Sequence, residues 1–449
     1  MTPPPRLRLL FGSLLGLALG LAAASPAQAN GRFPYAQHVV VRTGTDGVEE
    51  IVLRATFGLL WSRDGGQHFD WVCEQSMGFE GSWDPPIVFG QRSLIVGLPT
   101  GGSTSITGCD FAEIPTLAAS SIMDLAARDD GRTVVAIESV PVRANRLFVS
   151  RDDGQQFAVL GSGPVNVSFD TVELAPSDPL RLYATGVDAT SRHAVFYRSM
   201  DGGRSLQPIA LPVTDANGAF VSAVDSADAQ FIWLRLNTDL ASLLYVSRDG
   251  GDTWREAYRG RGALQGFALA QDGRAFVGGP DDGLLLSTDR GVTWRSIATT
   301  RVACLRHHNR ALYLCADWVA EPFALARIRD GETQIEPMLR FEDVRGAFAC
   351  AQTTSAQQQC APRWPAQRAI VTARRRDAGS QPLDADGLDG ASDSGSAEDA
   401  LSGRELATQP PRGCACRAQS QPPGQVNRSA ISLLVCAALW VSRRRSRCS

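Results

Sequence analysis

Short apolar runs separated by polar turns recur along the chain between residues 36 and 340. Each run is shorter than an ordinary helix, and each is bounded by Gly, Asp or Ser, which is typical of buried β-strands joined by turns. The clearest runs are GLLW, RLFV, VFYR, LLYV and LLL, and each leads into a polar turn that a second short run follows. The pattern therefore predicts a series of β-hairpins and an all-β fold.

Five of the polar turns share the pattern Ser-x-Asp-x-Gly-x-x-(Trp/Phe/Leu), beginning at Ser62, Ser150, Ser199, Ser247 and Ser287. Ser and Asp side chains can hydrogen-bond to nearby backbone groups and so fold a loop on itself. Glycine permits a positive φ where the chain reverses, and an aromatic residue closing the turn buries apolar area. The motif predicts a braced loop between two strands of each hairpin.

The spacing of the five motifs indicates the number of repeats. Their serines are separated by 88, 49, 48 and 40 residues, and a period of about 40–50 residues is that of a four-stranded propeller blade. The longest gap predicts a degenerate motif, which we assign to STSITGCDF from Ser103, and RIRDGETQI from Arg327 supplies a seventh unit. We therefore expect a seven-bladed β-propeller of four-stranded antiparallel blades over residues 36–368. The motifs should lie between the third and fourth strands. Closure by the N-terminal strand or by residues 341–368 remains open.

These turns resemble the Asp-box, or BNR, repeat of sialidases, sortilin-type ectodomains and photosystem II stability-factor-like proteins. The resemblance implies that the motif residues are structural. Leu206 departs from the aromatic pattern. The implied box residues are Ser62, Asp64, Gly66, Phe69, Ser150, Asp152, Gly154, Phe157, Ser199, Asp201, Gly203, Ser247, Asp249, Gly251, Trp254, Ser287, Asp289, Gly291 and Trp294.

The resemblance covers scaffold residues and implies no catalytic residue. Sialidases use an arginine triad, a Tyr–Glu pair and an acidic residue, and Arg32-Phe33-Pro34 matches their N-terminal motif poorly. Three functions stay open. The first is a non-enzymatic binding or scaffold propeller for a protein or glycan ligand at its face. The others are a polysaccharide-directed, sialidase-like glycoside hydrolase and an assembly factor for an envelope complex.

The N-terminus has the pattern of a secretory signal peptide over residues 1–29. Arg6 and Arg8 precede an apolar stretch, and Ala27-Gln28-Ala29 is a small-x-small cleavage pattern. Export places the mature chain in an oxidising compartment. The net charge of −3 gives no basic field that would favour nucleic acid as a partner.

Six cysteines in the propeller region are expected to form disulfides. Cys304 and Cys315 flank a turn symmetrically, Cys350 and Cys360 are close in sequence, and Cys73 and Cys109 remain. Spacing therefore predicts those three pairs among 15 possible pairings. No CxxC spacing occurs among the six, and His307 and His308 would face opposite sides of a strand, so we expect neither metal nor cofactor.

The C-terminal region carries a separate signal. Residues 369–412 are rich in Asp, Ser, Gly and Pro, which predicts a disordered linker. In residues 413–449, Cys414 and Cys416 precede a 13-residue apolar segment and an arginine cluster, and a stable membrane helix needs about 17–25 residues. This tail resembles the myxobacterial C-terminal sorting tag, which implies lipid attachment at Cys414 or Cys416. The alternative is an ordinary membrane helix. Either tail would tether a bacterial propeller to the envelope or cell surface.

Overall fold

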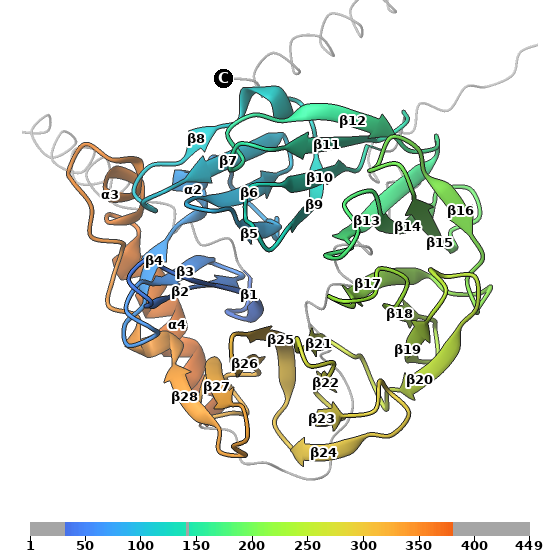
Figure 1. Ribbon diagram of the computed structural model, residues 1–449. Coiled ribbons are helices and arrows are strands. Elements are labelled where there is room, and N and C mark those ends of the chain that lie inside the picture. Colours follow the sequence, from blue (N-terminus) through green and yellow to red (C-terminus); the bar gives the residue numbers. More distant parts are fainter. Residues whose placement is uncertain (1–31, 141–142, 380–449) are drawn as a thin grey trace, which may run out of the picture. The chain divides into compact units, whose positions relative to one another are not determined.

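The computed structural model describes residues 32–140 and 143–379, which form seven four-stranded antiparallel sheets arranged as a ring (Figure 1). The predicted seven-bladed all-β propeller is confirmed. The first strand of each blade lies nearest the centre and the fourth lies at the rim (Figure 1).

Each blade uses four consecutive strands. Blades one to three comprise β1 (Ala36–Thr43), β2 (Glu49–Ala55), β3 (Gly58–Ser62) and β4 (Asp70–Val72); β5 (Ile87–Phe89), β6 (Leu94–Leu98), β7 (Gly101–Ser105) and β8 (Ala112–Glu113); and β9 (Ile122–Ala127), β10 (Val134–Glu138), β11 (Arg146–Ser150) and β12 (Ala158–Ser162). Blades four and five comprise β13 (Val167–Leu174), β14 (Leu182–Asp188), β15 (Ala194–Ser199) and β16 (Gln207–Ile209); and β17 (Gly218–Val224), β18 (Ile232–Asn237), β19 (Ser242–Ser247) and β20 (Arg255–Arg259). Blades six and seven comprise β21 (Gly266–Leu269), β22 (Ala275–Gly279), β23 (Gly283–Ser287) and β24 (Arg295–Ala298); and β25 (Val302–His308), β26 (Ala311–Ala316), β27 (Leu325–Arg329) and β28 (Glu336–Leu339).

The core consists of apolar side chains packed between neighbouring blades. The middle strands β3, β10 and β23 are buried at every position, because both faces of a blade are covered by its neighbours. Trp233 of blade five, for example, is fully buried and packs against Phe267 and Trp294 of blade six. This explains why the strands read as nearly continuous apolar runs.

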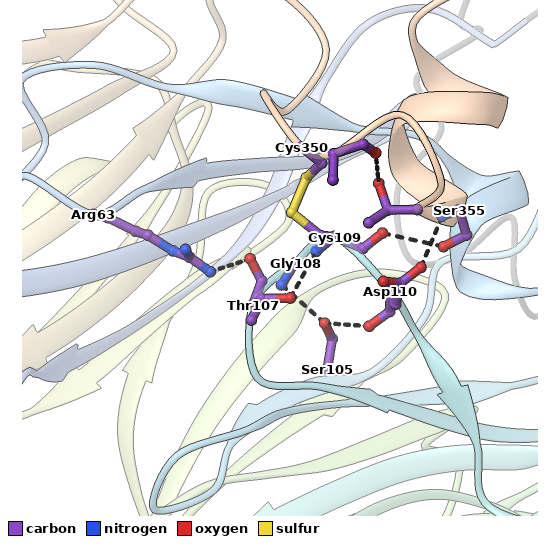
Figure 2. The surroundings of a disulfide bond; sticks show 10 residues. Arg63, Ser105, Thr107, Gly108, Cys109, Asp110, Cys350 and Ser355 are labelled. Atoms are coloured by element: carbon purple, nitrogen blue, oxygen red, sulfur yellow. Dashed lines mark hydrogen bonds between the residues drawn. A yellow bond between two sulfur atoms is a disulfide. The ribbon is translucent and has the colours of Figure 1, made fainter.

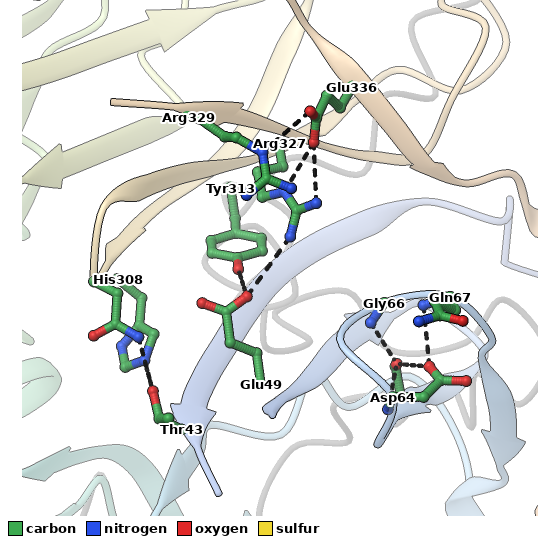
Figure 3. Close-up of polar contacts among 12 residues, drawn as sticks. Thr43, Glu49, Asp64, Gly66, Gln67, His308, Tyr313, Arg327, Arg329 and Glu336 are labelled. Carbon is green, nitrogen blue, oxygen red and sulfur yellow. Dashed lines mark hydrogen bonds and ion pairs between the residues drawn. The ribbon is translucent and has the colours of Figure 1, made fainter. Parts of the chain in front are cut away.

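The ring closes between blades seven and one without exchanging a strand. Blade seven is complete in itself, and its Tyr313 hydroxyl donates a hydrogen bond to Glu49 of blade one (Figure 3). Arg327 lies 3.7 Å from the same carboxylate, and the Trp318 indole donates to the Pro34 carbonyl at 2.5 Å. Polar side chains at this junction thus take the place of a shared strand.

A C-terminal segment, here called the clasp (residues 340–379), reinforces this closure from outside. It contains η2 (Phe341–Asp343), α3 (Ser355–Cys360) and α4 (Trp364–Gly379). Between η2 and α3 the chain runs beside β4, where Trp71 N–H donates to the Gly346 carbonyl at 2.7 Å and Phe348 N–H donates to the Trp71 carbonyl at 2.9 Å. The clasp therefore covers the outer edge of blade one. Two short helical turns, α2 (Glu74–Met77) and η1 (Pro115–Leu117), lie in the loops of blades one and two.

The disulfides confirm one predicted pair and correct two. Cys304 and Cys315 lie directly opposite each other on β25 and β26 and are bonded, with Cα atoms 4.7 Å apart.

The predicted pairs Cys350–Cys360 and Cys73–Cys109 are wrong. Cys73 bonds to Cys360. Cys109 bonds to Cys350, as Figure 2 shows. The error has a physical reason: the clasp returns to blades one and two, so proximity in space does not follow proximity in sequence. Ser355 at the start of α3 further fixes the clasp by donating its backbone N–H to Asp110 at 2.8 Å.

Several predicted segments lie partly or wholly outside the described residues. Helix α4 extends through residues 369–379, which the sequence assigns to the linker. The signal peptide, the remainder of the linker and the segment with Cys414 and Cys416 are outside. Among the described residues, no helix has the length and apolar character to cross a membrane.

Candidate functional site

The five Asp boxes occupy the turns between the third and fourth strands of blades one, three, four, five and six. All five therefore open onto one face of the ring, here called the box face, around its rim. They do not converge on a common centre, because each lies at the outer end of its own blade (Figure 1).

Each box is braced by its own serine and aspartate. In the box of blade five, the Ser247 hydroxyl accepts the Gly251 N–H at 2.8 Å and donates to Asp249 Oδ1 at 2.7 Å. Asp249 also accepts the N–H of Thr253 at 2.8 Å. The same serine contacts recur in the other four boxes at 2.7–2.9 Å, as Figure 3 shows for Asp64 and Gly66.

These hydrogen bonds keep the box carboxylates ionised. Hydrogen bonds from the side chain and backbone of Ser205 lower the pKa of Asp201 to about 2, and those from Thr293 do the same for Asp289. For Asp249, burial alone would raise the pKa, but hydrogen bonds from Thr253 and Ser247 outweigh it and lower the pKa. Donors of the loop itself already hydrogen-bond to these carboxylate oxygens, which is what a structural role in bracing the loop requires.

The closing aromatic residues join neighbouring blades. Phe69 and Phe157 are almost fully buried. The Trp294 indole donates to the Ala257 carbonyl of the preceding blade at 2.8 Å, and Trp254 donates to Ala210 at 3.3 Å. Leu206 occupies this position in blade four and has no such donor.

The two degenerate units differ from the sequence assignment in detail. In blade two the residue at the end of the third strand is Ser105, not Ser103, and its hydroxyl accepts the Gly108 N–H at 2.8 Å (Figure 2). Thr107 takes the place of the box aspartate. In blade seven, Arg329 ends the third strand where the other units carry serine.

A second group of polar residues, here called the axial cluster, surrounds the centre of the ring. It comprises His38, Asp124, Glu173 and Arg306, which belong to the innermost strands β1, β9, β13 and β25, together with Arg54 of β2. The other innermost strands, β5, β17 and β21, carry no titratable side chain. Four strands of the ring therefore concentrate the ionisable groups around its centre.

The pKa values of the axial carboxyl groups are raised, whereas those of the box carboxyl groups are lowered. Burial, and then the charge of Asp124, raise the pKa of Glu173 to about 8, although Arg306 opposes the shift. Burial raises the pKa of Asp124 to about 7 despite the backbone N–H groups of Val172 and Leu125, which it accepts.

His38 is neutral at physiological pH. Burial and the charges of Arg54 and Arg306 lower its pKa to about 3. The two arginines keep their charge, since the guanidinium group stays protonated in proteins. With Glu173 largely neutral, the cluster carries net positive charge at pH 7.

The axial side chains retain unused hydrogen-bonding capacity. Within the described residues, Arg306 is exposed and forms no ion pair. Arg54 donates to the backbone carbonyls of Asp84 and Pro85, at 3.4 and 3.0 Å, while its buried Nε has no hydrogen-bond partner. Buried polar groups ordinarily find partners because an unmet one is costly. The axial cluster is therefore the better candidate for a ligand site.

The face opposite the boxes is bordered by the first described residues. Arg32 forms two hydrogen bonds to Asp84, at 2.7 and 2.8 Å, and Gln37 donates to the same carboxylate at 2.8 Å. The Tyr35 hydroxyl donates to Gln265 of blade six at 3.1 Å. The negative charge of Asp84 is thus already neutralised and does not offset the axial arginines.

The sequence did not identify the axial cluster. The available signal was an acid inside a largely apolar strand, with one acid in IMDLAA and two in VSFDTVEL. His307 and His308 face different partners, Asp330 at 3.2 Å and Thr43 at 3.0 Å. The part of the chain that the structure describes contains no group of three or more acidic, His or Cys residues that could hold a metal ion.

No model of a known protein family matches the sequence, and no curated protein matches it. Solved structures with a similar fold include an extracellular domain from B. thetaiotaomicron, at 13% identity and a TM-score of 0.48 over 66% of this chain and 40% of that one. YCF48 from Cyanidioschyzon merolae is 14% identical over 48% of this chain and 71% of that one, with a TM-score of 0.33. The GH74 xyloglucanase from Xanthomonas campestris is 16% identical over 73% and 66%, with a TM-score of 0.31. The chain spans about two fifths of the first protein, and these similarities concern the fold alone.

Proposed function

We propose that this protein is an exported, non-enzymatic binding module whose ligand site is the axial cluster. The observation that carries the proposal is the contrast in hydrogen bonding between two polar regions. The box carboxylates are satisfied by their own loops, whereas Arg306 and the Nε of Arg54 have capacity to spare. Such capacity at the centre of a rigid ring is what recognition of a polar ligand requires.

Export is supported by the covalent structure. Three disulfides join the six cysteines of the described propeller and clasp, and such bonds persist in oxidising compartments outside the cytosol. Two of them fix the clasp, so the ring would be held closed after secretion. The N-terminal signal pattern agrees with this destination.

The decisive experiment measures ligand binding by the full exported chain. Thermal shift against a panel of polar small molecules and oligosaccharides would identify a ligand, and calorimetry would then compare variants. We expect Arg306→Gln to weaken binding at least tenfold, while the matched rim variant Arg295→Gln binds normally. A ligand whose affinity is insensitive to Arg306→Gln and to Glu173→Gln would contradict the axial site.

A second candidate, a polysaccharide-directed hydrolase, is favoured by one specific observation. Asp124 and Glu173 are two carboxyl groups with raised pKa values near the same axis, and a carboxyl group held neutral at pH 7 can act as a general acid. Release of reducing ends from xyloglucan or a sialoside, abolished by Asp124→Asn and by Glu173→Gln, would support it. Normal binding without turnover would favour the binding module.

We further propose that the chain is tethered to the envelope by lipid at Cys414 or Cys416. The apolar segment beyond them is shorter than a durable membrane span requires. Intact-mass measurement of protein from the cell surface should find a C-terminus near these cysteines that lacks the arginine cluster. Recovery of the chain through Ser449 would instead indicate a membrane helix.

A further inference from the structure

A pocket of about 290 Å³, here called the rim pocket, lies between the Asp box of blade one (residues 62–69) and residues 345–349 of the clasp. None of its lining residues belongs to the axial cluster. The clasp runs beside β4 at this point, since the Arg345 N–H donates to the Phe69 carbonyl at 3.1 Å. Blade one is the only blade of the described ring whose outer strand pairs with a further segment. The rim pocket is therefore particular to this box.

One part of the rim pocket is lined by Trp61, Phe348 and Ala349. The rings of Trp61 and Phe348 pack against each other, with centroids 5.8 Å apart. The Arg63 guanidinium lies over both rings, at 5.2 and 5.0 Å from their centroids, and donates to the Thr107 carbonyl (Figure 2). Stacking and hydrogen bonding hold the guanidinium in one position. A ligand would therefore meet a fixed surface that is apolar on one side.

Every ionisable side chain that lines the rim pocket is bonded to another ionisable group. The pairs are Arg345–Asp70 at 2.9 Å, His68–Asp64 at 2.7 Å and Arg63–Glu50 at 3.4 Å. The two arginines and the two aspartates of the lining cancel in formal charge. An ionic ligand would compete with one member of a pair and be repelled by the other. The lining therefore favours a neutral ligand.

The pairs leave hydrogen-bonding capacity of both kinds. A guanidinium group has five N–H donors, and Arg345 uses two of them on Asp70. Each carboxylate oxygen has two lone pairs, and each oxygen of Asp70 accepts a single bond from Arg345. The rim pocket can thus donate to a neutral ligand and accept from it without breaking an ion pair.

His68 distinguishes this box from the other four. The corresponding residues of blades three to six are Gln156, Ser205, Thr253 and Thr293. The hydroxyl groups of Ser205, Thr253 and Thr293 donate to the second oxygen of the box aspartate at 2.5–2.6 Å. Histidine makes the same contact through Nδ1, and its Nε2 has no partner within the described residues. The bracing contact is kept, and a spare ring nitrogen is added to the lining of the rim pocket.

We infer that the rim pocket binds a neutral sugar residue of a glycan. Sugar hydroxyl groups both donate and accept hydrogen bonds, as Arg345, Asp70 and His68 require together. A pyranose ring also has a face of C–H groups, which can lie against the apolar side of the rim pocket. This site is additional to the axial cluster and does not depend on it.

The clasp side of the rim pocket is held covalently. Ala349 directly precedes Cys350, which is bonded to Cys109 of blade two (Figure 2). The Phe348 N–H donates to the Trp71 carbonyl at 2.9 Å, which ties the same stretch to β4. A site that is rigid before the ligand arrives has less conformational entropy to lose on binding.

The test is titration of the full exported chain with the methyl glycosides of glucose, galactose, mannose and N-acetylglucosamine, followed by saturation-transfer NMR and calorimetry. We expect one of these neutral rings to bind in the millimolar range, because a single ring makes few contacts. The corresponding uronate and amino sugar carry a charge at pH 6 on the same ring. Both should bind more weakly than the neutral glycoside.

Two variants act on the rim pocket while keeping the box intact. His68→Thr retains a donor to Asp64, as threonine does in blades five and six, but removes Nε2. It should weaken glycoside binding about fivefold, which corresponds to the loss of one hydrogen bond. Ala349→Trp fills the rim pocket and should abolish binding. Gln156→Thr makes the matched change in blade three and should bind as the unmodified protein does, and melting temperatures would verify folding.

Three results would overturn the inference. The first is the absence of glycoside binding by folded protein. The second is glycoside binding that neither His68→Thr nor Ala349→Trp changes, which would place the sugar elsewhere on the propeller. The third is tighter binding of the uronate or the amino sugar, which would make the ligand ionic.

Discussion

The box face and the axial cluster place the same chemical group in opposite surroundings. A box aspartate such as Asp201 accepts several hydrogen bonds from its own loop, and its pKa falls to about 2. Glu173 at the axis is half-buried, and the loss of hydration together with the charge of Asp124 raises its pKa to about 8. The first arrangement stabilises the ionised form and the fold, whereas the second disfavours ionisation and leaves a group that a ligand can use.

The two regions also differ in how the chain builds them. A box closes within a few residues, because its serine bonds to a glycine four positions later. The axial cluster joins strands from positions 38 to 306, which meet only when the ring is complete. Contacts between residues close in sequence thus form the boxes of the scaffold, whereas the axial cluster forms from residues far apart in sequence.

The largest expected effect is on the pH dependence of stability. Because the folded-state pKa values of Asp124 and Glu173 are raised, the folded protein binds more protons than the unfolded chain between about pH 4 and pH 8, and stability falls as pH rises through this window. Raising a pKa from 3.8 to about 7 corresponds to at most about 4 kcal/mol at high pH. The double variant Asp124→Asn, Glu173→Gln removes this dependence. The free energy of unfolding of the double variant minus that of the unmodified protein should therefore be more positive at pH 9 than at pH 5. Urea unfolding at both pH values measures this, and an unchanged difference would place these acids in ordinary solvent.

A smaller effect is expected at a box. Asp249→Ala removes the acceptor of the Ser247 and Thr253 groups, and Trp254→Ala removes an aromatic contact with Phe196. Each should lower the free energy of unfolding by about 1–4 kcal/mol. Axial binding should persist, and Arg295→Gln on the exposed rim strand of blade six serves as the control. Loss of binding at an unchanged melting temperature would make the box a ligand site instead.

Acid should act on the boxes in the opposite direction to its effect at the axis. A lowered folded-state pKa contributes stability that is present above about pH 4 and is lost as pH falls toward about 2. The stability difference between the unmodified protein and Asp201→Asn should therefore shrink as pH falls from 6 to 2.5. Guanidinium unfolding at each pH measures it, and a constant difference would mean that the carboxylate is not stabilised by its loop.

What could be predicted from the sequence follows the same division between local and long-range structure. The repeat of Ser-x-Asp-x-Gly predicted the blades and their number, because each motif contains its own hydrogen-bond partners. Cys304 and Cys315 could be paired across one hairpin. The pairs of Cys73 and Cys109 with the clasp could not, since their separations of 287 and 241 residues reflect ring closure.

The axial cluster could not be predicted from the sequence for a related reason. Asp124 is the one acid of β9 and Glu173 is one of two acids in β13, and only the circular arrangement gives Asp124 and Glu173 a common environment. The repeat pattern placed the degenerate box at Ser103, two residues before Ser105, because the decayed motif lacks the aspartate that fixes its register.

The smallest expected effect concerns Leu206, which closes the box of blade four where Trp254 and Trp294 close the next two. Both tryptophans donate an indole N–H to the preceding blade, at 3.3 and 2.8 Å, and Leu206 is half-buried against the same part of its neighbour. Leu206→Trp should add apolar contact and a donor facing β12, raising the free energy of unfolding by about 0.5–1 kcal/mol and the melting temperature by about 1–2 °C. Leu206→Phe adds an aromatic ring without the donor and should gain less. Because the box carries scaffold chemistry alone, axial binding should not change in either variant. A fall in melting temperature with tryptophan would show that the blade-four box is packed around leucine and has its own closing geometry.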